Sequence, residues 1–465
     1  MTESSAKPAA IPTAARARLD HLLNGRIPSL IARLSAPNIV VVTAMTMVTI
    51  ADAWFVSHIG VHGLASLALV YPVQALMQMM SAGAMGGGVS SAVARALGAG
   101  LRQRAEAVVL HAVIIALGMA GLYLVCGALL ARPLFALAGG TGQVLEGTVA
   151  YAQIAFGGGA AMWLANTFAS VLRGTGNMIV PAVVIVAMSL FQVLASGAFT
   201  LGWGLFPELG VRGPAVALIA AFSLATLLMG GYLAAGRGGV RLRLVGVPLR
   251  WELFRDIIKV GGVACANALL TIATVLVVTR LVAQHGAAAL AGYGLGSRLE
   301  LMIVPLAYGI GGALTVAVGT NFGARQFARA RRIAWTGGLA VASVTGLVGL
   351  AVALWPALWL AHFTADPQAY AFGVRYLTIV APFYGFFGGG MALYFASQGT
   401  GNMTWPFTAG ALRLLVVAGG GAAVTLVFGM GPAVLFALVA VGLLFFGTII
   451  LSSLFFRVWN PEFGG

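Results

Sequence analysis

Two long stretches of this 465-residue chain contain no Asp, Glu, Lys or Arg. One lies between Asp52 and Arg95, and the other lies between Arg413 and Arg457. A helix needs ~20 apolar residues to cross the hydrocarbon layer of a membrane, so each stretch is long enough for two spans. Charged residues make up only 8% of the chain, too few to cover the surface of a soluble protein of this size. The sequence therefore predicts an all-α membrane protein with many spans.

Glycine and proline divide the apolar stretches into single spans, because these residues interrupt helices. The clearest breaks are at residues 61–63 and 429–432. The same reasoning predicts twelve spans along the whole chain. Their expected ranges are 36–58, 63–88, 105–130, 147–171, 178–201, 212–235, 258–284, 288–318, 333–361, 371–397, 404–428 and 432–456.

The distribution of basic residues predicts the orientation of the chain in the membrane. The net charge is +15, but Lys and Arg form short clusters between apolar runs, so nucleic acid is not an expected partner. Twenty of the 26 basic residues fall in the tail and loops of one side, and the opposite side holds only Arg132 and Arg212. Basic loops stay in the cytoplasm. We therefore expect a protein of the bacterial cytoplasmic (inner) membrane, with both termini cytoplasmic.

An internal repeat divides the spans into two equal sets. The pentapeptide Gly-Thr-Gly-Asn-Met occurs at 174–178 and again at 399–403, 225 residues later, and Gly98-Ala99 recurs at the same spacing as Gly323-Ala324. Six spans per repeat give both halves the same orientation, so the expected fold has two six-helix bundles related by a pseudo-twofold axis along the membrane normal. Such a design favours a rocking carrier over a pore. The expected organisation is a cytoplasmic tail at 1–35, an N-lobe at 36–235, a cytoplasmic linker at 236–257 and a C-lobe at 258–465.

Several motifs, in order along the chain, resemble the multidrug and toxic compound extrusion (MATE) family of the MOP flippase superfamily. They are residues 51–60, the loops 94–100 and 318–324, and the paired glycine loops 172–177 and 398–402. This resemblance covers the chain from about residue 30. It implies alternating-access antiport that exports amphipathic, often cationic compounds, driven by inward H⁺ or Na⁺ flow.

Asp52 is the expected coupling carboxylate. It lies about six residues, or ~9 Å, from the outer end of the first span. An ionisable group within the membrane costs free energy, so its presence there suggests a function. Asp52 could instead reach the external interface, but the resemblance implies a coupling role, because the family carries an aspartate there. The resemblance also places Gln192 and Ser196 where the sodium-coupled branch carries an Asn-x-x-x-Asp pair. The missing charge favours H⁺ over Na⁺ as the coupling ion.

Glu300 is the second acid predicted to lie within the membrane, near the middle of the eighth span. Its repeat partner is Gln74, and a polar pair at equivalent positions suggests sites facing the cleft between the lobes. An alternative interpretation is a structural ion pair with Arg413 or, less favourably, with Arg298. The expected cleft residues are Gln74, Asn267, Thr271, Arg298, Glu300 and Arg413, although Asn267 and Thr271 occupy a region where part of the family carries an acid.

Motifs for other functions are missing from the sequence. There is no phosphate-binding loop, protease or lipase motif, so we expect neither an enzyme nor a nucleotide-driven pump. Cys126 and Cys265 lie in apolar runs and suggest no metal site, and the only expected cofactor is the coupling ion, H⁺ or Na⁺. The expected partners are small amphipathic substrates and the lipid bilayer, and we expect a monomer. A flippase of lipid-linked oligosaccharide or another lipid remains the alternative.

Overall fold

The computed structural model describes residues 13–243 and 245–459, and these residues form helices joined by short turns. The first half contains α1 (Thr13–Asn24), α2 (Ile27–Ser57), α3 (Val61–Gln78), η1 (Met79–Met85), α4 (Gly86–Gly98), α5 (Arg102–Leu129), α6 (Ala131–Leu137), α7 (Gly142–Gly157), α8 (Gly159–Gly174), α9 (Ile179–Leu201), η2 (Gly210–Arg212) and α10 (Gly213–Ala234). The second half contains α11 (Trp251–Ala283), α12 (Ala287–Gly323), α13 (Phe327–Leu354), α14 (Ala357–Leu360), α15 (Pro367–Val380), η3 (Ala381–Phe383), α16 (Tyr384–Thr400), α17 (Thr404–Leu414), η4 (Leu415–Gly420), η5 (Ala423–Val427), α18 (Pro432–Ser453) and η6 (Arg457–Trp459).

The predicted number of spans agrees with the helices observed. Within the described residues, eleven helical segments are long and apolar enough to cross a membrane. A twelfth span results when α7 and α8 are counted together, since they form one apolar segment that bends by 48° near Gly158. The fold is therefore the expected one of twelve membrane-spanning helical segments.

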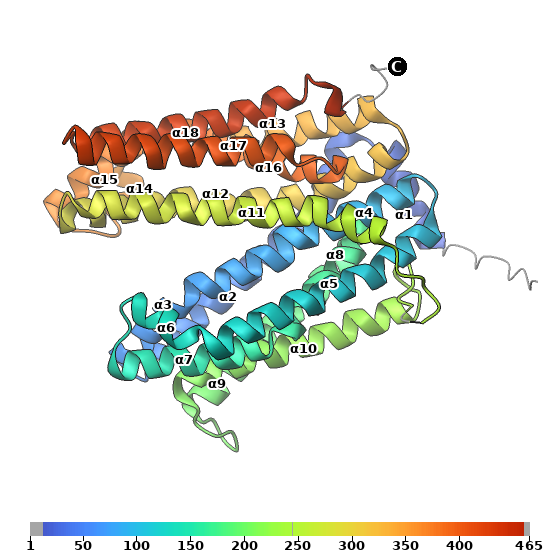
Figure 1. Cartoon of the computed structure of the whole chain (residues 1–465), viewed down its shortest axis with the longest axis horizontal. Helices are drawn as coiled ribbons and strands as arrows, with labels where there is room; N and C mark the ends of the chain where they lie inside the picture. Colours follow the sequence, from blue (N-terminus) through green and yellow to red (C-terminus); the bar gives the residue numbers. More distant parts are fainter. Residues whose placement is uncertain (1–12, 244, 460–465) are drawn as a thin grey trace, which may run out of the picture.

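The two halves form two separate lobes that meet at one end and diverge toward the other (Figure 1). Helices α2–α10 form the N-lobe and helices α11–α18 form the C-lobe. Both ends of the described chain, and the connection between α10 and α11, lie where the lobes meet (Figure 1). We call this the closed end. The short helix α6 and the α9–α10 connection lie at the opposite end of the N-lobe.

At the closed end, α4 and α12 cross in a way that reflects the repeat. A Cβ atom on Gly98 would lie 2.0 Å from the carbonyl oxygen of Thr320, and one on Gly323 would lie 2.1 Å from that of Arg95. Gly323 is the repeat partner of Gly98, and Thr320 is the repeat partner of Arg95, both at a spacing of 225 residues. The second contact is therefore the symmetric copy of the first. Backbones can approach this closely only where glycine replaces a larger residue. The crossing therefore lies near the axis that relates the two lobes.

Several helix boundaries differ from the predicted ones. α2 begins at Ile27 rather than 36, and α11 begins at Trp251 rather than 258, so amphipathic turns extend both helices beyond their apolar runs. In the opposite direction, α13 ends at Leu354 rather than 361, because Pro356 cannot continue the helix. The predicted N-terminal tail contains helix α1, and its first twelve residues lie outside the described part.

Candidate functional site

The N-lobe holds a buried carboxyl group on its first spanning helix. Asp52 lies five residues before the end of α2 and is 7% exposed. Ser196 of α9 donates a hydrogen bond of 2.5 Å to Asp52 Oδ1. Among the residues that the structure describes, no Lys, Arg or His forms an ion pair with this carboxyl group. Asp52 is therefore a buried acid whose charge has no fixed counterion in residues 13–243 and 245–459.

The packing of α9 against α2 creates this contact. Gly197 lies beside Ser196, and the space where a Cβ would stand is filled by the rings of Phe55 and Trp203, which meet edge to face. The small residue lets the two helices approach closely enough for a short serine side chain to reach the aspartate. Gln192 lies one turn earlier on α9 and is also buried, but no hydrogen bond joins it to Asp52 within the described residues.

A second polar pair lies near Asp52 in the N-lobe. Tyr151 of α7 is fully buried, and its hydroxyl group donates a hydrogen bond of 2.8 Å to Gln74 Oε1 of α3. Tyr151 is close enough to Asp52 to interact with it electrostatically. The sequence suggested Gln74 but not Tyr151, because a tyrosine in an apolar run resembles a packing residue. Gln74 itself is only half-buried.

The C-lobe also holds one buried acid, but there the charge is neutralised. Arg413 Nη2 of α17 lies 2.9 Å from Glu300 Oε1 of α12, and both side chains are buried. Tyr376 donates a hydrogen bond of 2.6 Å to the other carboxylate oxygen. The guanidinium group also lies over the ring of Phe387, 4.8 Å from its centre. This is the ion pair that the sequence offered as the alternative to a cleft site.

The repeat shows how the two lobes differ at equivalent positions. Tyr376 is the repeat partner of Tyr151, at a spacing of 225, and Glu300 corresponds to Gln74, at 226. Both lobes therefore contain a tyrosine that donates a hydrogen bond to the same position of the neighbouring helix. Arg413 corresponds to Met188, and Ser196 corresponds to Gly421. At these equivalent positions, the C-lobe therefore has both members of an ion pair and the N-lobe has neither. The hydroxyl group that bonds to Asp52 has no counterpart in the C-lobe.

The remaining predicted cleft residues take no part in this ion pair. Arg298 is exposed and forms no ion pair with the acids in the described residues. Asn267 is buried against Gly410 of α17, and its Oδ1 has no hydrogen-bond partner among the residues that the structure describes. Thr271 donates a hydrogen bond to the Asn267 carbonyl oxygen, one turn earlier on α11. No group of three or more His, Cys, Asp or Glu that could hold a metal ion occurs in residues 13–243 and 245–459.

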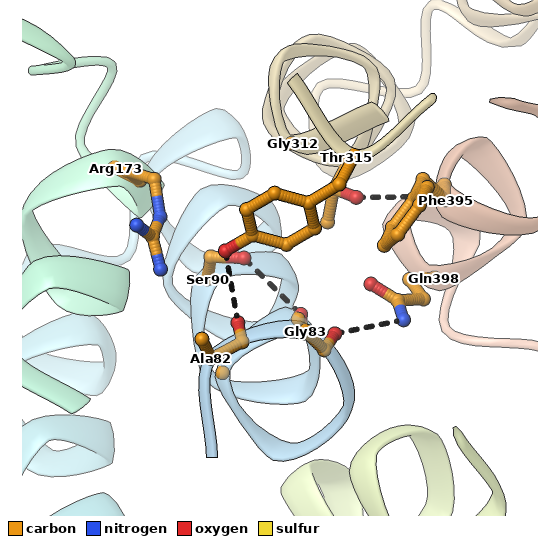
Figure 2. A pocket seen from close by; sticks show the side chains of 11 residues that line it. Ala82, Gly83, Ser90, Arg173, Gly312, Thr315, Phe395 and Gln398 are labelled. Atoms are coloured by element: carbon orange, nitrogen blue, oxygen red, sulfur yellow. Dashed lines mark hydrogen bonds between the residues drawn. The ribbon is translucent and has the colours of Figure 1, made fainter. Parts of the chain in front are cut away.

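A small cavity lies between the lobes near the closed end (Figure 2). Its lining includes repeat partners at a spacing of 225: Gly87 with Gly312, Ser90 with Thr315, and Arg173 with Gln398. Arg173 and Gln398 approach from opposite sides (Figure 2). The cavity volume is about 10 Å³, room for roughly one water molecule. Drug-sized ligands need at least about 300 Å³, so the lobes are shut here.

Comparisons with known proteins identify the same family as the sequence motifs. The family model MatE matches residues 37–196 and 262–424. An FAD transporter of Shewanella oneidensis is 23% identical over 78% of this chain and 80% of its own length. A probable multidrug resistance protein NorM of Thermotoga maritima is 26% identical over 77% of this chain and 76% of its own. A solved MOP superfamily transporter of Pyrococcus furiosus has the same fold, with a TM-score of 0.85 at 21% identity, covering 94% of this chain and 97% of that one.

Proposed function

Because this chain belongs to the MatE family of membrane transporters, we propose that it is a secondary efflux antiporter. It exports amphipathic, often cationic compounds, and inward flow of H⁺ supplies the driving force. The proposal also places both termini and the closed end in the cytoplasm, since the basic loops lie at that end. The diverging ends of the lobes then face outward.

The contrast between Asp52 and Glu300 carries this proposal. Arg413 already compensates the charge of Glu300, so the binding of a proton or a second cation to Glu300 is little favoured. Asp52 has only the hydroxyl group of Ser196 as a hydrogen-bond partner and no fixed counterion within the described residues. A lone carboxyl group in apolar surroundings favours its neutral form, and it becomes charged when water or a cation reaches it. Asp52 is therefore the group that exchanges a proton.

Helix α2 links Asp52 to the contact between the lobes. Asn38 Nδ2, on the same helix, donates a hydrogen bond of 3.3 Å to the carbonyl oxygen of Gly309 in the C-lobe. Pro37 lies inside α2 beside this contact. A proline removes one backbone hydrogen bond and is a common point of helix bending. A change at Asp52 that alters the packing of α2 can thus move the region where α2 touches the C-lobe.

Transport by purified protein in liposomes tests the proposal. We expect an imposed inward H⁺ gradient to drive export of a fluorescent organic cation, and a protonophore to stop it. Asp52→Asn should abolish this transport and leave the protein folded. Glu146→Gln is the matched control, because that acid is exposed and pairs with Arg132 at the opposite end of the N-lobe. Gradient-driven export by Asp52→Asn at the rate of the parent would refute the coupling role.

The similarity to an FAD transporter supports a second candidate substrate, FAD. The same liposomes loaded with FAD and with the fluorescent cation would rank the two substrates directly.

A lipid flippase receives less support, because anionic lipid heads need accessible cations. Of the two arginines among the predicted cleft residues, Arg413 is buried against Glu300.

A further inference from the structure

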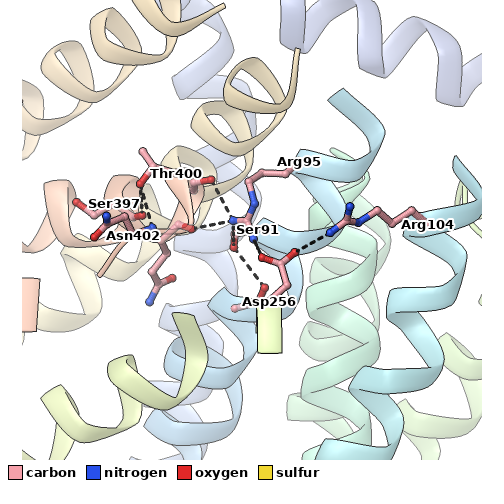
Figure 3. A network of polar contacts seen from close by, with 10 residues as sticks. Ser91, Arg95, Arg104, Asp256, Ser397, Thr400 and Asn402 are labelled. Carbon is pink, nitrogen blue, oxygen red and sulfur yellow. Dashed lines mark hydrogen bonds and ion pairs between the residues drawn. The ribbon is translucent and has the colours of Figure 1, made fainter. Parts of the chain in front are cut away.

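The closed end contains a polar cluster centred on Arg95, near the carboxyl-terminal end of α4 (Figure 3). Arg95 belongs to the N-lobe, but its guanidinium group reaches the C-lobe. Nη2 donates a hydrogen bond of 2.7 Å to Asp256 Oδ1 of α11. Nη1 donates to the carbonyl oxygens of Gln398, at 3.4 Å, and Gly399, at 3.3 Å. One side chain thus joins α4 to both α11 and the end of α16.

Electrostatics favours this arrangement. The last carbonyl groups of a helix carry partial negative charge, and a cation near them is stabilising. Asp256 adds a full negative charge, and the planar guanidinium fork can reach both partners at once. Ser91, one turn earlier on α4, accepts a hydrogen bond of 2.8 Å from Arg95 Nη1 and fixes its direction. Gly401 lies against the guanidinium group with a positive φ of 81°, and a Cβ there would lie 3.1 Å from it.

The repeat shows that helix crossing alone does not require this cluster. The repeat partner of Arg95 is Thr320, and that of Asp256 is Ile31, neither of which is charged. The partner of Gly401 is Gly176, which is covered instead by the side chain of Leu22 from α1. The two equivalent positions are therefore joined differently, and only one of them uses an ion pair within the described residues. A contact that is charged, partly exposed and not needed for the crossing can break and reform.

We propose that Arg95 is a positioning residue of the transport cycle, which holds the closed end shut through Asp256 and the carboxyl-terminal end of α16. In each cycle the guanidinium group releases both partners as the lobes separate at this end. Water then solvates the separated charges, so release costs less than in a dry interior. This inference rests on the proposed function, because only an alternating-access carrier needs to open here.

Thiol labelling measures opening without substrate or ion gradient. The reporter is Ser90→Cys, which lies in the small cavity between the lobes and is 5% exposed. The background carries alanine in place of Cys126 and Cys265, and the probe is a hydrophilic maleimide on protein in detergent. We expect Arg95→Gln to speed labelling about tenfold and Asp256→Asn to speed it less, because Arg95 then keeps its contacts with α16. Arg95→Lys should lie between Arg95→Gln and the parent.

Two controls separate this role from a general loss of structure. Arg104→Gln changes a half-exposed arginine that lies 4.0 Å from the same aspartate, and it should label at the parent rate. The double variant, Arg95→Gln with Asp256→Asn, should label no faster than Arg95→Gln alone, because both changes remove the same contact. Equal labelling rates for Arg95→Gln, Asp256→Asn and the parent would overturn the proposal. Faster labelling of Arg95→Gln in a protein that shows no gradient-driven transport would instead refute the proposed function. Arg95 would then still hold the closed end shut, but outside a transport cycle of that kind.

Discussion

Within the described residues, Ser196 donates the only hydrogen bond to the buried carboxyl group of Asp52. The sequence indicates both residues. Asp52 stands out as an acid within an apolar span, and the resemblance to the family gives the position of Ser196 on α9. The sequence does not indicate Tyr151, whose hydrogen bond to Gln74 exists only because α7 packs on α3. An isolated tyrosine gives no local signal of such a contact, so this part of the site required the structure.

Loss of the hydroxyl group of Ser196 should weaken transport without unfolding the protein. A hydrogen bond to a charged group contributes about 1.5–3 kcal/mol, so we expect Ser196→Ala to lower gradient-driven export by roughly tenfold or more. Thr200→Val is the matched control. Thr200 lies one turn later on α9, and its buried hydroxyl group has no hydrogen-bond partner in the described part of the chain. Initial rates in liposomes provide the measurement. Equal rates for the two variants would contradict a role for the Ser196 hydroxyl group.

The ion pair of Glu300 and Arg413 should be structural rather than part of the coupling. Removing one partner of a buried pair costs about 3–5 kcal/mol, so Arg413→Met alone should lower the thermal stability markedly. The double variant Glu300→Gln, Arg413→Met installs the residues of the equivalent N-lobe positions, Gln74 and Met188. We expect it to recover most of the stability and to retain transport. A stable double variant without transport would show that the pair takes part in function.

At the scale of helices, the apolar pattern predicted where spans lie better than where they end. α2 and α11 extend beyond the predicted spans because their first turns are amphipathic and pack at the closed end. The π-helical segments η1, η4 and η5 could not be predicted, because no residue type marks a change from one helical hydrogen-bond pattern to another. The repeat of Gly98 as Gly323, in contrast, is visible in the sequence and indicates a symmetric feature, which the structure shows to be the crossing of α4 and α12.

The crossing of α4 and α12 predicts a strong effect of small substitutions at these glycines. A Cβ on Gly98 would collide with the backbone oxygen of Thr320, which cannot rotate away as a side chain would. Overpacking of this kind costs about 1–3 kcal/mol, so Gly98→Ala should lower the melting temperature and open the closed end. Gly118→Ala is the control, because a Cβ on that helical glycine of α5 meets open space. Thermal unfolding in detergent compares the two, and equal stability would contradict the tight crossing.

At the scale of the whole molecule, the 225-residue spacing predicted two related bodies, and the structure confirms a fold of two six-span lobes. It could not predict how the lobes sit, because an internal repeat fixes a symmetry relation but not the angle between its parts. That angle depends on individual polar contacts between the lobes, such as those of Arg95 and Asn38. These contacts involve residues far apart in sequence and differ between the two halves.

A reversible cross-link between the lobes tests whether transport needs them to separate at the closed end. Ile39 of α2 and Gly309 of α12 are suitable positions, because a Cβ on Gly309 would lie 3.7 Å from the Ile39 Cα. This proximity is compatible with a disulfide, whose Cα atoms usually lie about 4.4–6.8 Å apart. In a background without native cysteines, we expect oxidation of Ile39→Cys, Gly309→Cys to stop transport and reduction to restore it. Each single variant should transport equally well under both conditions. Undiminished transport by the fully cross-linked protein would mean that substrate crosses the membrane without separation of α2 from α12, and the rocking mechanism would have to be abandoned.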